Sequence, residues 1–331
     1  MEENRAEQLF FLWEKISEGE IRLLRVFGEQ PVVTVPGFID GRCVRELGDY
    51  CFSRRKLPEN EIRYSRYCGG MWESGLSVLK DKEKKEELSA DGPYVLYQPD
   101  GKTRVISVDK KGKITDTTYA ALPEDFTLHV VDHKGRFPFD VKLHPVKRPD
   151  WQYRQPEKVF VMSDPHGRLD CVISLLQGNG VIDKNYNWSY GNNHLMVIGD
   201  IFDRGKDVPQ IFWLFYKLED EAAKAGGTVS FLLGNHEPLV LANDLRYTKD
   251  KYKVLAQKLN MDYPKLFGPD TELGKWLGTR NTMQTIGSDL YVHAGLGKNF
   301  YDRNLSIPTV NEEMSKALFM NKKERLSLIH I

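Results

Sequence analysis

Short apolar runs that end in polar, metal-binding residue types recur in the second half of the chain. Polar residues just past the C-terminal end of a short apolar run are typical of an α/β sheet, which places its chemistry there. The runs occupy residues 159–162, 195–198, 229–233 and 290–292. Helices are predicted after the first two runs, near Leu169 to Leu176 and near Pro209 to Ala225. This alternation predicts two β-α-β crossovers in a fold of the α/β class.

A group of strands is predicted ahead of that fold, in residues 91–150. Apolar residues at 94–97 and 103–108 flank the turn sequence Pro99-Asp100-Gly101, which predicts a hairpin. Further strands are predicted after the turn at Lys111-Gly112 and at residues 126–131 and 139–143. The histidines here have no metal-binding spacing, so we expect structural or surface roles for His129, His133 and His144.

The first 90 residues have a different pattern. Apolar residues at helical spacing predict an amphipathic helix over residues 1–16. Its core or docking face would consist of Leu9, Leu12, Trp13 and Ile16. Residues 18–53 alternate apolar and polar positions between turn residues, which predicts short strands. Residues 57–90 are polar and irregular, and they predict a linker.

Length and charge limit the class of protein. A chain of 331 residues, 40% of them hydrophobic, can bury a substantial core, and we expect one catalytic domain with a small appendage. The 47 Lys and Arg residues balance the 47 Asp and Glu residues, so no overall field favours a nucleic acid or a membrane as partner. The apolar stretch Leu9 to Trp13 is too short for a signal-peptide core, and the expected location of the chain as written is the cytoplasm; an intact relative could be exported.

Cysteine spacing favours reduced thiols. No C-x-x-C pair occurs among Cys43, Cys51, Cys68 and Cys171. A disulfide between Cys43 and Cys51 is the alternative.

The polar residues after the apolar runs form a set of hard and borderline metal ligands. The candidates are Asp164, His166, Asp200, Asn235 and His293. Carboxylate, imidazole and amide oxygen without thiolate suit Mn, Fe or Zn in an open site. Asp200 lies centrally in this order and could bridge two metal ions. Two ions about 3.5 to 4 Å apart clamp a phosphate and generate hydroxide for in-line attack at phosphorus, so the set predicts phosphoester hydrolysis.

Three residues of the same loops fit the remaining steps of such a reaction. Arg204 can make paired hydrogen bonds to phosphate oxygens as negative charge develops. His236 is the candidate proton donor to the leaving oxygen, and Asp203 is the candidate partner that orients its imidazole. Asn235 and Arg246 are further candidates for substrate binding, although Arg246 could instead cap a helix.

These motifs carry a resemblance to a known family. Asp-x-His-Gly, Gly-Asp-x-x-Asp-Arg-Gly, Gly-Asn-His-Glu and His-Ala-Gly occur in this order, beginning at Asp164, Gly199, Gly234 and His293. The chain therefore resembles the calcineurin-like metallophosphoesterases, specifically the phosphoprotein phosphatase branch. The sequence at 243–247 is similar to the bacterial Shewanella-like type. Ser163 and Ala294 stand where the family often has Gly.

The resemblance, which covers about residues 91–325, implies a four-layer αββα sandwich with two metal ions at the strand ends. It implies that Asp164 and His166 bind the first ion, that Asp200 bridges, and that Asn235 and His293 bind the second. The family has one more metal-binding His and one more phosphate-binding Arg after the His-Ala-Gly motif. We expect from this that the chain is truncated at its C-terminus and that its second metal is bound less tightly.

Both ends have features that the catalytic resemblance does not cover. Residues 33–52 resemble one unit of the bacterial surface-antigen leucine-rich repeat, and a single unit cannot bury its own apolar face. The expected organisation is a helix with this orphan unit over 1–56, a linker or chimeric seam over 57–90, strands over 91–150 and a catalytic domain over 151–325. The tail 326–331 resembles a translated sequencing adapter and is expected not to belong to the natural protein.

Three functions remain open on the sequence. The first is a metal-dependent phosphoprotein phosphatase acting on phosphotyrosine or on phosphoserine and phosphothreonine. The second is a small-molecule phosphoesterase, such as a diadenosine tetraphosphate hydrolase. The third is an inactive fragment or binding module that acts through its repeat-like N-terminus.

Overall fold

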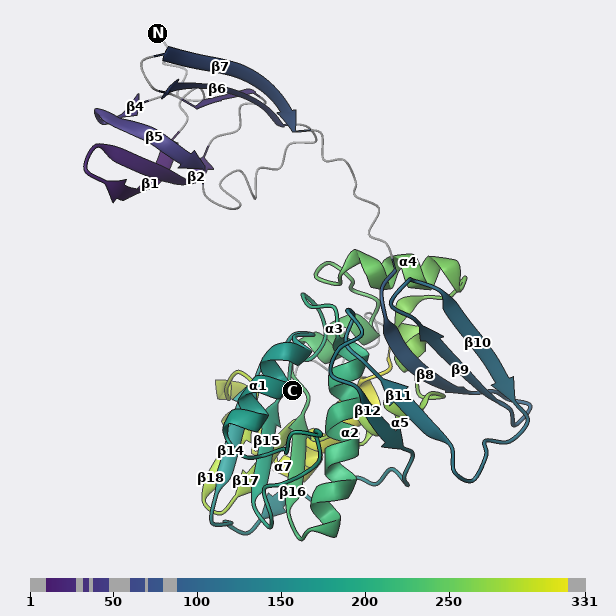
Figure 1. The fold of residues 1–331 in the computed structure, drawn as a ribbon. Helices are drawn as coiled ribbons and strands as arrows, with labels where there is room; N and C mark the ends of the chain where they lie inside the picture. The colour runs from purple at the N-terminus through teal and green to yellow at the C-terminus, as the bar shows by residue number, and fades with distance from the viewer. Residues whose placement is uncertain are drawn as a thin grey trace. The chain divides into compact units, whose positions relative to one another are not determined.

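The computed structural model describes residues 10–27, 32–35, 38–47, 60–68, 71–79 and 88–320. The chain divides into two compact units, Met1–Lys85 and Glu86–Ile331 (Figure 1). The boundary lies inside the predicted linker, and the strands predicted at 91–150 belong to the same unit as the motif-bearing runs.

The described part of the first unit consists of short strands. One sheet has the order β1-β2-β5-β4, and the strands are β1 (Phe10–Ser17), β2 (Glu20–Phe27), β4 (Phe38–Ile39) and β5 (Arg42–Leu47). A second sheet has the order β3-β6-β7, with β3 (Val32–Val35), β6 (Asn60–Cys68) and β7 (Met71–Leu79). Parallel pairing places Glu20 opposite Cys43, a separation within the ~20 to 29 residues of one leucine-rich repeat. The repeat resemblance itself stays a prediction.

The predicted N-terminal helix is wrong where the structure describes it, because β1 occupies residues 10–17. Phe11 and Trp13 alternate with exposed residues and pack against a small buried cluster of Ile21, Leu23 and Val44. Leu12 and Ile16, which belonged to the predicted helical stripe, are exposed. Pairing with β2 therefore decides the conformation, since tertiary contacts override a short helical pattern. Residues 1–9 of the predicted helix lie outside the described residues.

The predicted linker is also wrong over most of its length. Strands β6 and β7 form an antiparallel pair that runs from Asn60 opposite Leu79 to Cys68 opposite Met71. Residues of high strand propensity, such as Ile62, Tyr64 and Trp72, stand among the charged residues of this segment. The Gly-Gly pair at 69–70 of the sequence is a hairpin signal that the linker prediction overlooked.

In the second unit, a parallel sheet confirms the predicted crossovers. Its strands β14 (Val159–Ser163), β15 (His194–Ile198) and β16 (Thr228–Leu232) are adjacent in this order and parallel throughout. Helix α1 (Leu169–Gly178) connects the first two strands, and α2 (Val208–Lys224) connects the second two. All three strands therefore end at the same edge of the sheet, where the motif residues follow them.

A second sheet packs against the first and completes the layers. It has the order β13-β17-β18, with β13 (Gln152–Tyr153), β17 (Met283–Ile286) and β18 (Asp289–Val292). Met196, Leu232 and Ile286 form a buried cluster that joins both sheets, whereas Leu195 and Val197 belong to the larger core with α1 and α2. Helix α7 (Ile307–Ala317) contacts β17. This arrangement confirms the αββα sandwich (Figure 1).

The other elements of this unit surround the sandwich. The predicted early strands are present as a sheet of β10 (Ile114–Tyr119), β9 (Thr103–Val108) and β8 (Asp91–Tyr97) and a pair of β11 (Thr127–Val130) and β12 (Phe139–Lys142). The remaining helices are α3 (His236–Leu241), α4 (Asp250–Lys258), the 3-10 helix η2 (Tyr263–Phe267), α5 (Glu272–Gly278) and α6 (Lys298–Asp302). Among the described residues, no helix is both long and apolar enough to span a bilayer.

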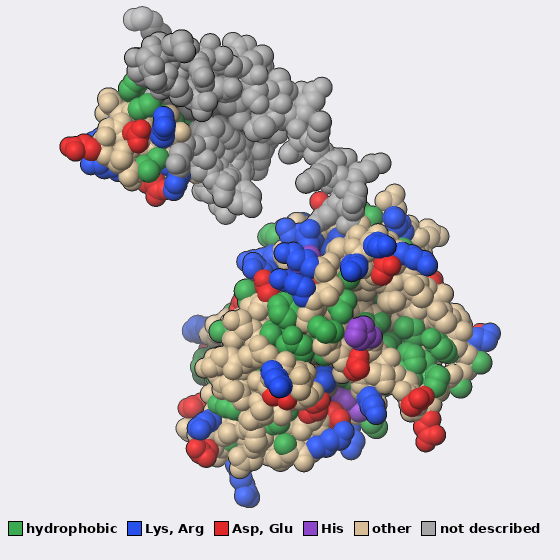
Figure 2. All heavy atoms as spheres, in the orientation of Figure 1, with side chains coloured by type: hydrophobic (Ala, Val, Ile, Leu, Met, Phe, Trp, Pro, Cys, Tyr) green, Lys and Arg blue, Asp and Glu red, His purple; other side chains and the backbone are tan. Residues whose placement is uncertain are grey.

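The early histidines have the structural or surface contacts expected of them, whereas the alternative cysteine pairing stays untested. His129 pairs with Asp140, His133 pairs with Asp207, and His144 stacks on Tyr216. In the described part of the chain, Cys43 and Cys171 are free thiols; Cys51, the other member of the alternative disulfide, lies outside it. Charged side chains of both signs occur across the visible face of the second unit (Figure 2).

Candidate metal centre

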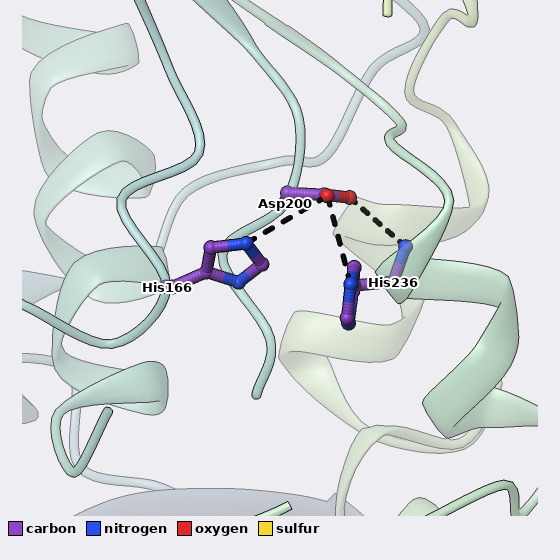
Figure 3. Close-up of side chains that lie close together, drawn as sticks. All are labelled: His166, Asp200 and His236. Carbon is purple, nitrogen blue, oxygen red and sulfur yellow. Dashed lines mark hydrogen bonds and ion pairs between the residues drawn. The ribbon is translucent and has the colours of Figure 1, made fainter. Parts of the chain in front are cut away.

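The ends of four strands bring the candidate ligands together around Asp200. Asp164 and His166 follow β14, Asp200 follows β15, Asn235 follows β16, and His293 follows β18. The Oδ2 atom of Asp200 lies 3.9 Å from Nε2 of His166 and 3.3 Å from Nε2 of His293. Figure 3 shows His166, Asp200 and His236 pointing toward one another.

Asp200 belongs to two groups of potential ligands. His166, Asp200 and His236 form one group, and Asp164, Asp200 and His293 form the other, with ligand atoms within 4.8 Å of one another in each. Asn235, at the start of α3, places its Oδ1 atom 3.0 Å from Nε2 of His293 and so lies beside the second group. A carboxylate common to two groups has the position that a bridging ligand requires.

The hydrogen bonds of His166 and His293 leave one lone pair on each ring for a cation. Nδ1 of His166 lies 2.7 Å from the Phe202 carbonyl oxygen, and Nδ1 of His293 lies 2.9 Å from that of Ile198. A carbonyl can only accept, so in the neutral imidazole Nδ1 carries the proton and Nε2 is bare. Both bare nitrogens face the Asp200 carboxylate. Acceptors that face acceptors at these distances repel unless a cation lies between them, so the residues fit divalent metal ions.

The backbone of these loops is strained at the candidate ligands. Asp164, His166 and Asp200 have φ angles of 52°, 41° and 61°, in the left-handed region that non-glycine residues rarely occupy. Such a residue costs on the order of 1 to 3 kcal/mol, and it persists only where surrounding contacts hold it. Those contacts include bonds from Asp164 N to Gly199 O at 3.1 Å and from His166 N to Asp200 O at 3.0 Å.

Glu237 holds the Asp200 loop and was missed as a functional residue by the sequence analysis. Its fully buried carboxylate accepts hydrogen bonds from the backbone N–H groups of Ile201 at 2.8 Å, Asp200 at 3.0 Å and Gly234 at 2.7 Å. Burial, followed by the nearby charge of Asp200, raises the pKa of Glu237. A signal for it existed, because Glu237 is the last residue of the Gly-Asn-His-Glu motif.

Two glycines allow the strand ends to approach each other. A Cβ atom on Gly199, which has φ of 71°, would meet the backbone of Gly234. A Cβ atom on Gly234 would meet Oδ1 of Asp200. Larger residues at either position would force apart the loops that carry the ligands.

His236 is buried between two carboxylates. Its Nδ1 lies 2.6 Å from Oδ2 of Asp203, and its Nε2 lies 3.9 Å from Oδ2 of Asp200. The first distance fits the predicted pairing with Asp203. The second makes His236 a geometric member of the first ligand group, a role that the sequence analysis did not give it. Oδ1 of Asp203 accepts a hydrogen bond from the hydroxyl of Thr248 at 2.6 Å. No sequence signal pointed to Thr248.

The two candidate phosphate-binding arginines differ in their surroundings. Arg204 is exposed, with φ of 62°, and its backbone N–H donates to Tyr247 O at 3.0 Å. Within the described residues, no hydrogen bond or ion pair holds its exposed guanidinium, whose role in phosphate binding stays a prediction. Arg246 is exposed and donates twice to Asp244, at 2.8 Å each. That pairing occupies the fork of Arg246, whose role in substrate binding stays a prediction.

An apolar hollow of about 630 Å³ adjoins the centre. Asn235 and His293 lie on its wall together with Phe300, Met314 and Leu318. All of its lining residues are in the described part of the chain, and none of them is Lys or Arg. The hollow therefore offers apolar contact rather than binding sites for several phosphates.

A comparison with protein families decides the family. The sequence model of the calcineurin-like phosphoesterases matches residues 157–330, more than half of the 331-residue chain. The chain belongs to the calcineurin-like phosphoesterases. This confirms the resemblance that the motifs carry and agrees with the sandwich fold.

Individual relatives show how far the similarity extends. Shewanella-like protein phosphatase 2 of Arabidopsis thaliana is 26% identical over 205 residues, which cover 49% of this chain and 52% of the relative. Shewanella-like protein phosphatase 1 of Plasmodium berghei (strain Anka) is 31% identical over 156 residues, 46% of this chain and 42% of the relative. The chain spans about half the length of the curated relatives it matches.

A solved structure covers more of the chain. The cold-active protein-tyrosine phosphatase of a psychrophilic Shewanella species superposes with a TM-score of 0.64 at 33% identity. The match covers 71% of this chain and 70% of that one. The similarity therefore extends beyond residues 157–330 of the family match.

Proposed function

We propose that this calcineurin-like phosphoesterase hydrolyses phosphomonoesters on proteins with the help of two divalent metal ions, Mn, Fe or Zn. The observation that carries the proposal is the Asp200 carboxylate, shared by two ligand groups whose bare histidine nitrogens face it. Asp164 and His166, whose Oδ1 and Nε2 atoms lie 3.8 Å apart, would hold one ion. Asn235 and His293, whose Oδ1 and Nε2 atoms lie 3.0 Å apart, would hold the other, although Asp164 also belongs to the group of His293. Bound divalent ions supply Lewis acidity to the phosphate oxygens and to an attacking water.

The chain's own residues would bind the phosphate and move the proton. Arg204 would bind two phosphate oxygens with its planar guanidinium, which stabilises the charge that develops there during transfer. Asp203 accepts the Nδ1–H of His236 and so turns Nε2 toward the centre. A protonated Nε2 would donate its proton to the leaving oxygen. Because Nε2 is 3.9 Å from Asp200, the same nitrogen could instead bind the first metal ion, and the experiment below separates the two roles.

The hollow beside Asn235 and His293 favours a protein substrate over a dinucleotide. A diadenosine tetraphosphate carries several negative charges that require cationic side chains for binding. The hollow has apolar walls and no Lys or Arg among its lining residues, all of them described. It suits the apolar part of a phosphorylated side chain, such as a tyrosine ring. Relatives named as protein phosphatases and a structure named as a protein-tyrosine phosphatase support the same substrate class.

The proposal is tested by turnover of three substrates by the Mn²⁺-loaded chain. We expect hydrolysis of phosphotyrosine and phosphoserine peptides and none of diadenosine tetraphosphate, with about two ions bound per chain. Selective turnover of the dinucleotide would replace the protein substrate with a small molecule. If fewer than two ions bind and none of the substrates turns over, the proposal fails and a binding role of the N-terminal unit takes its place.

The role of His236 has its own test. His236→Asn should leave two ions bound and lower kcat, by far more on a phosphoserine peptide than on an aryl phosphate, because an alkoxide leaves poorly without a proton. Loss of one bound ion in this variant would instead assign His236 as a metal ligand. Equal losses on both substrates would reject the proton-donor role.

A further inference from the structure

A short segment at the start of α4 bonds repeatedly to the loop that follows β15. Four hydrogen bonds join residues 247–252 to residues 203–208. In two of them the segment donates: Thr248 Oγ1 to Asp203 Oδ1 at 2.6 Å and Lys251 Nζ to Lys206 O at 2.5 Å. In the other two it accepts, from Arg204 N on Tyr247 O at 3.0 Å and from Val208 N on Tyr252 Oη at 3.0 Å. The loop between these contacts carries both Asp203 and Arg204. The segment 247–252 is therefore placed to set the conformation of that loop.

The segment is itself anchored in the core. Lys251 is 1% exposed, and its ammonium lies 3.1 Å from Oδ1 of Asp91 and donates to Ala90 O at 3.2 Å, at the start of β8. Tyr252 is fully buried and stacks on Tyr263. A buried, paired charge and a stacked ring leave little freedom of movement, so the bonds to the loop originate from a fixed base.

Within this segment, the Thr248 side chain has the most direct connection to the candidate proton donor His236, because it bonds to Asp203. Thr248 is 5% exposed and Asp203 is 2% exposed, so water cannot readily replace the bond between them. An ionised carboxylate accepts only, so Thr248 donates to Oδ1 while His236 Nδ1–H donates to Oδ2. The two bonds fix both oxygens of the carboxylate, and the carboxylate in turn fixes the imidazole. A residue that holds such a partner acts on the reaction through orientation.

We propose that Thr248 is a positioning residue that orients His236 for proton donation through Asp203; the inference rests on the proposed function of His236. Without the hydroxyl, Oδ1 of Asp203 lacks this donor in a buried site that water does not readily enter, and the carboxylate is no longer held in its orientation. Nε2 of His236 then points less often at the leaving oxygen. The loss should fall on the step that needs the proton, and binding of substrate and metal should be unaffected.

The test compares Thr248→Val with Thr248→Ser in the full chain loaded with Mn²⁺. In T248V, which keeps the shape and removes the hydroxyl, kcat on a phosphoserine peptide should fall on the order of tenfold, the scale of one hydrogen bond to a charged group. KM, bound Mn²⁺ and kcat on p-nitrophenyl phosphate should change little. T248S restores the hydroxyl and should restore kcat on the peptide.

A measurement on the metal-free chain gives a readout that is independent of turnover. Solvent exchange of the His236 Nδ1 proton, followed by nuclear magnetic resonance, should be several-fold faster in T248V than in wild type. Thr271→Val is the matched control, because it removes a buried hydroxyl that bonds to Gly268 O and Gly274 N at α5. This variant should melt earlier and leave both the proton exchange and the substrate dependence unchanged.

Several results would overturn the assignment of Thr248. They are wild-type kcat of T248V on the peptide, equal losses on both substrates, and no rescue by T248S. If T248V does not fold, Thr248→Ala repeats the experiment without pressing a methyl group against Asp203. Unfolding of both variants beside a folded T248S would make the hydroxyl a structural group and reject the positioning role. Failure of the proposed function can be told apart from failure of the Thr248 assignment. In the first case, His236→Asn would lower kcat equally on the phosphoserine peptide and the aryl phosphate.

Discussion

Glu237→Gln should destabilise the second unit and weaken metal binding together. The carboxylate of Glu237 accepts the N–H of Asp200 and Gly234 on Oε2 and that of Ile201 on Oε1. In the amide, an NH₂ group replaces one oxygen and points its hydrogens at backbone donors. The Asp200 loop, strained at φ of 61°, then loses part of what holds it.

The size of the effect follows from the bonds lost. A hydrogen bond to a charged group contributes about 1.5 to 3 kcal/mol, and at least one such bond becomes a contact between two donors. Removing a buried charge offsets part of this loss, since the charge no longer has to be desolvated. We therefore expect a net loss of about 2 kcal/mol, which for a unit of this size lowers Tm by about 4 to 8 °C. Misplacing the residues around a metal ligand weakens metal affinity by about 10- to 100-fold.

The assay is a thermal melt of the metal-free chain together with a Mn²⁺ titration. Glu219→Gln is the matched control, because Oε2 of Glu219 accepts from Trp276 Nε1 at 2.6 Å and from Arg280 Nη1 at 2.8 Å, away from Asp200. The control should lower Tm and leave the Mn²⁺ affinity at the wild-type value. A Glu237→Gln chain that melts within about 2 °C of wild type and binds Mn²⁺ equally well would refute the reasoning.

Three further predictions concern metal loading, loop approach and acid stability. Asp200→Asn should reduce bound Mn²⁺, measured by elemental analysis, from about two ions to fewer than one, because both ligand groups share this carboxylate. Gly234→Ala should lose more than about 2 kcal/mol of unfolding free energy in urea, because its Cβ would meet Asp200, whereas Gly178→Ala, with open space around it, should not. Burial lowers the pKa of His194 to about 4. As pH falls from 6.5 to 4, the imidazole is therefore protonated in the unfolded state and stays neutral in the folded state. The free energy of unfolding should therefore fall in that window by up to about 3 kcal/mol more in wild type than in His194→Gln. Urea unfolding at pH 7 and pH 4 measures the difference, and an equal fall in both proteins would contradict the prediction.

Much of the catalytic unit could be predicted from its sequence. The apolar runs at β15 and β16 are short and largely buried, the run at β14 lies at the edge of the described sheet with Val161 exposed, and helices separate the three runs. Short apolar runs that alternate with helices are typical of a parallel sheet. The carboxyl ends of parallel strands meet at one edge, so the convergence of Asp164, His166 and Asp200 follows from their place after the runs.

The first unit was predicted less well for a physical reason. Residues 10–17 have apolar positions that satisfy a helical stripe and a strand alternation at once. Contacts with β2 and β5, through Ile21, Leu23 and Val44, decide between the two. Short elements with mixed signals depend on partners elsewhere in the chain, and local pattern does not contain that information.

The sequence by itself determined the ligand types, their order and the sheet edge at which they gather, because local periodicity and turn residues encode strands and their ends. Only the tertiary structure decided which groups hold the ligands in place. Glu237 bonds across 36 positions to Ile201, and Thr248 bonds across 45 positions to Asp203, and no local pattern marks such pairs. The reason is that a buried carboxylate or hydroxyl needs a hydrogen-bond partner, and the folded structure alone determines which residues become partners.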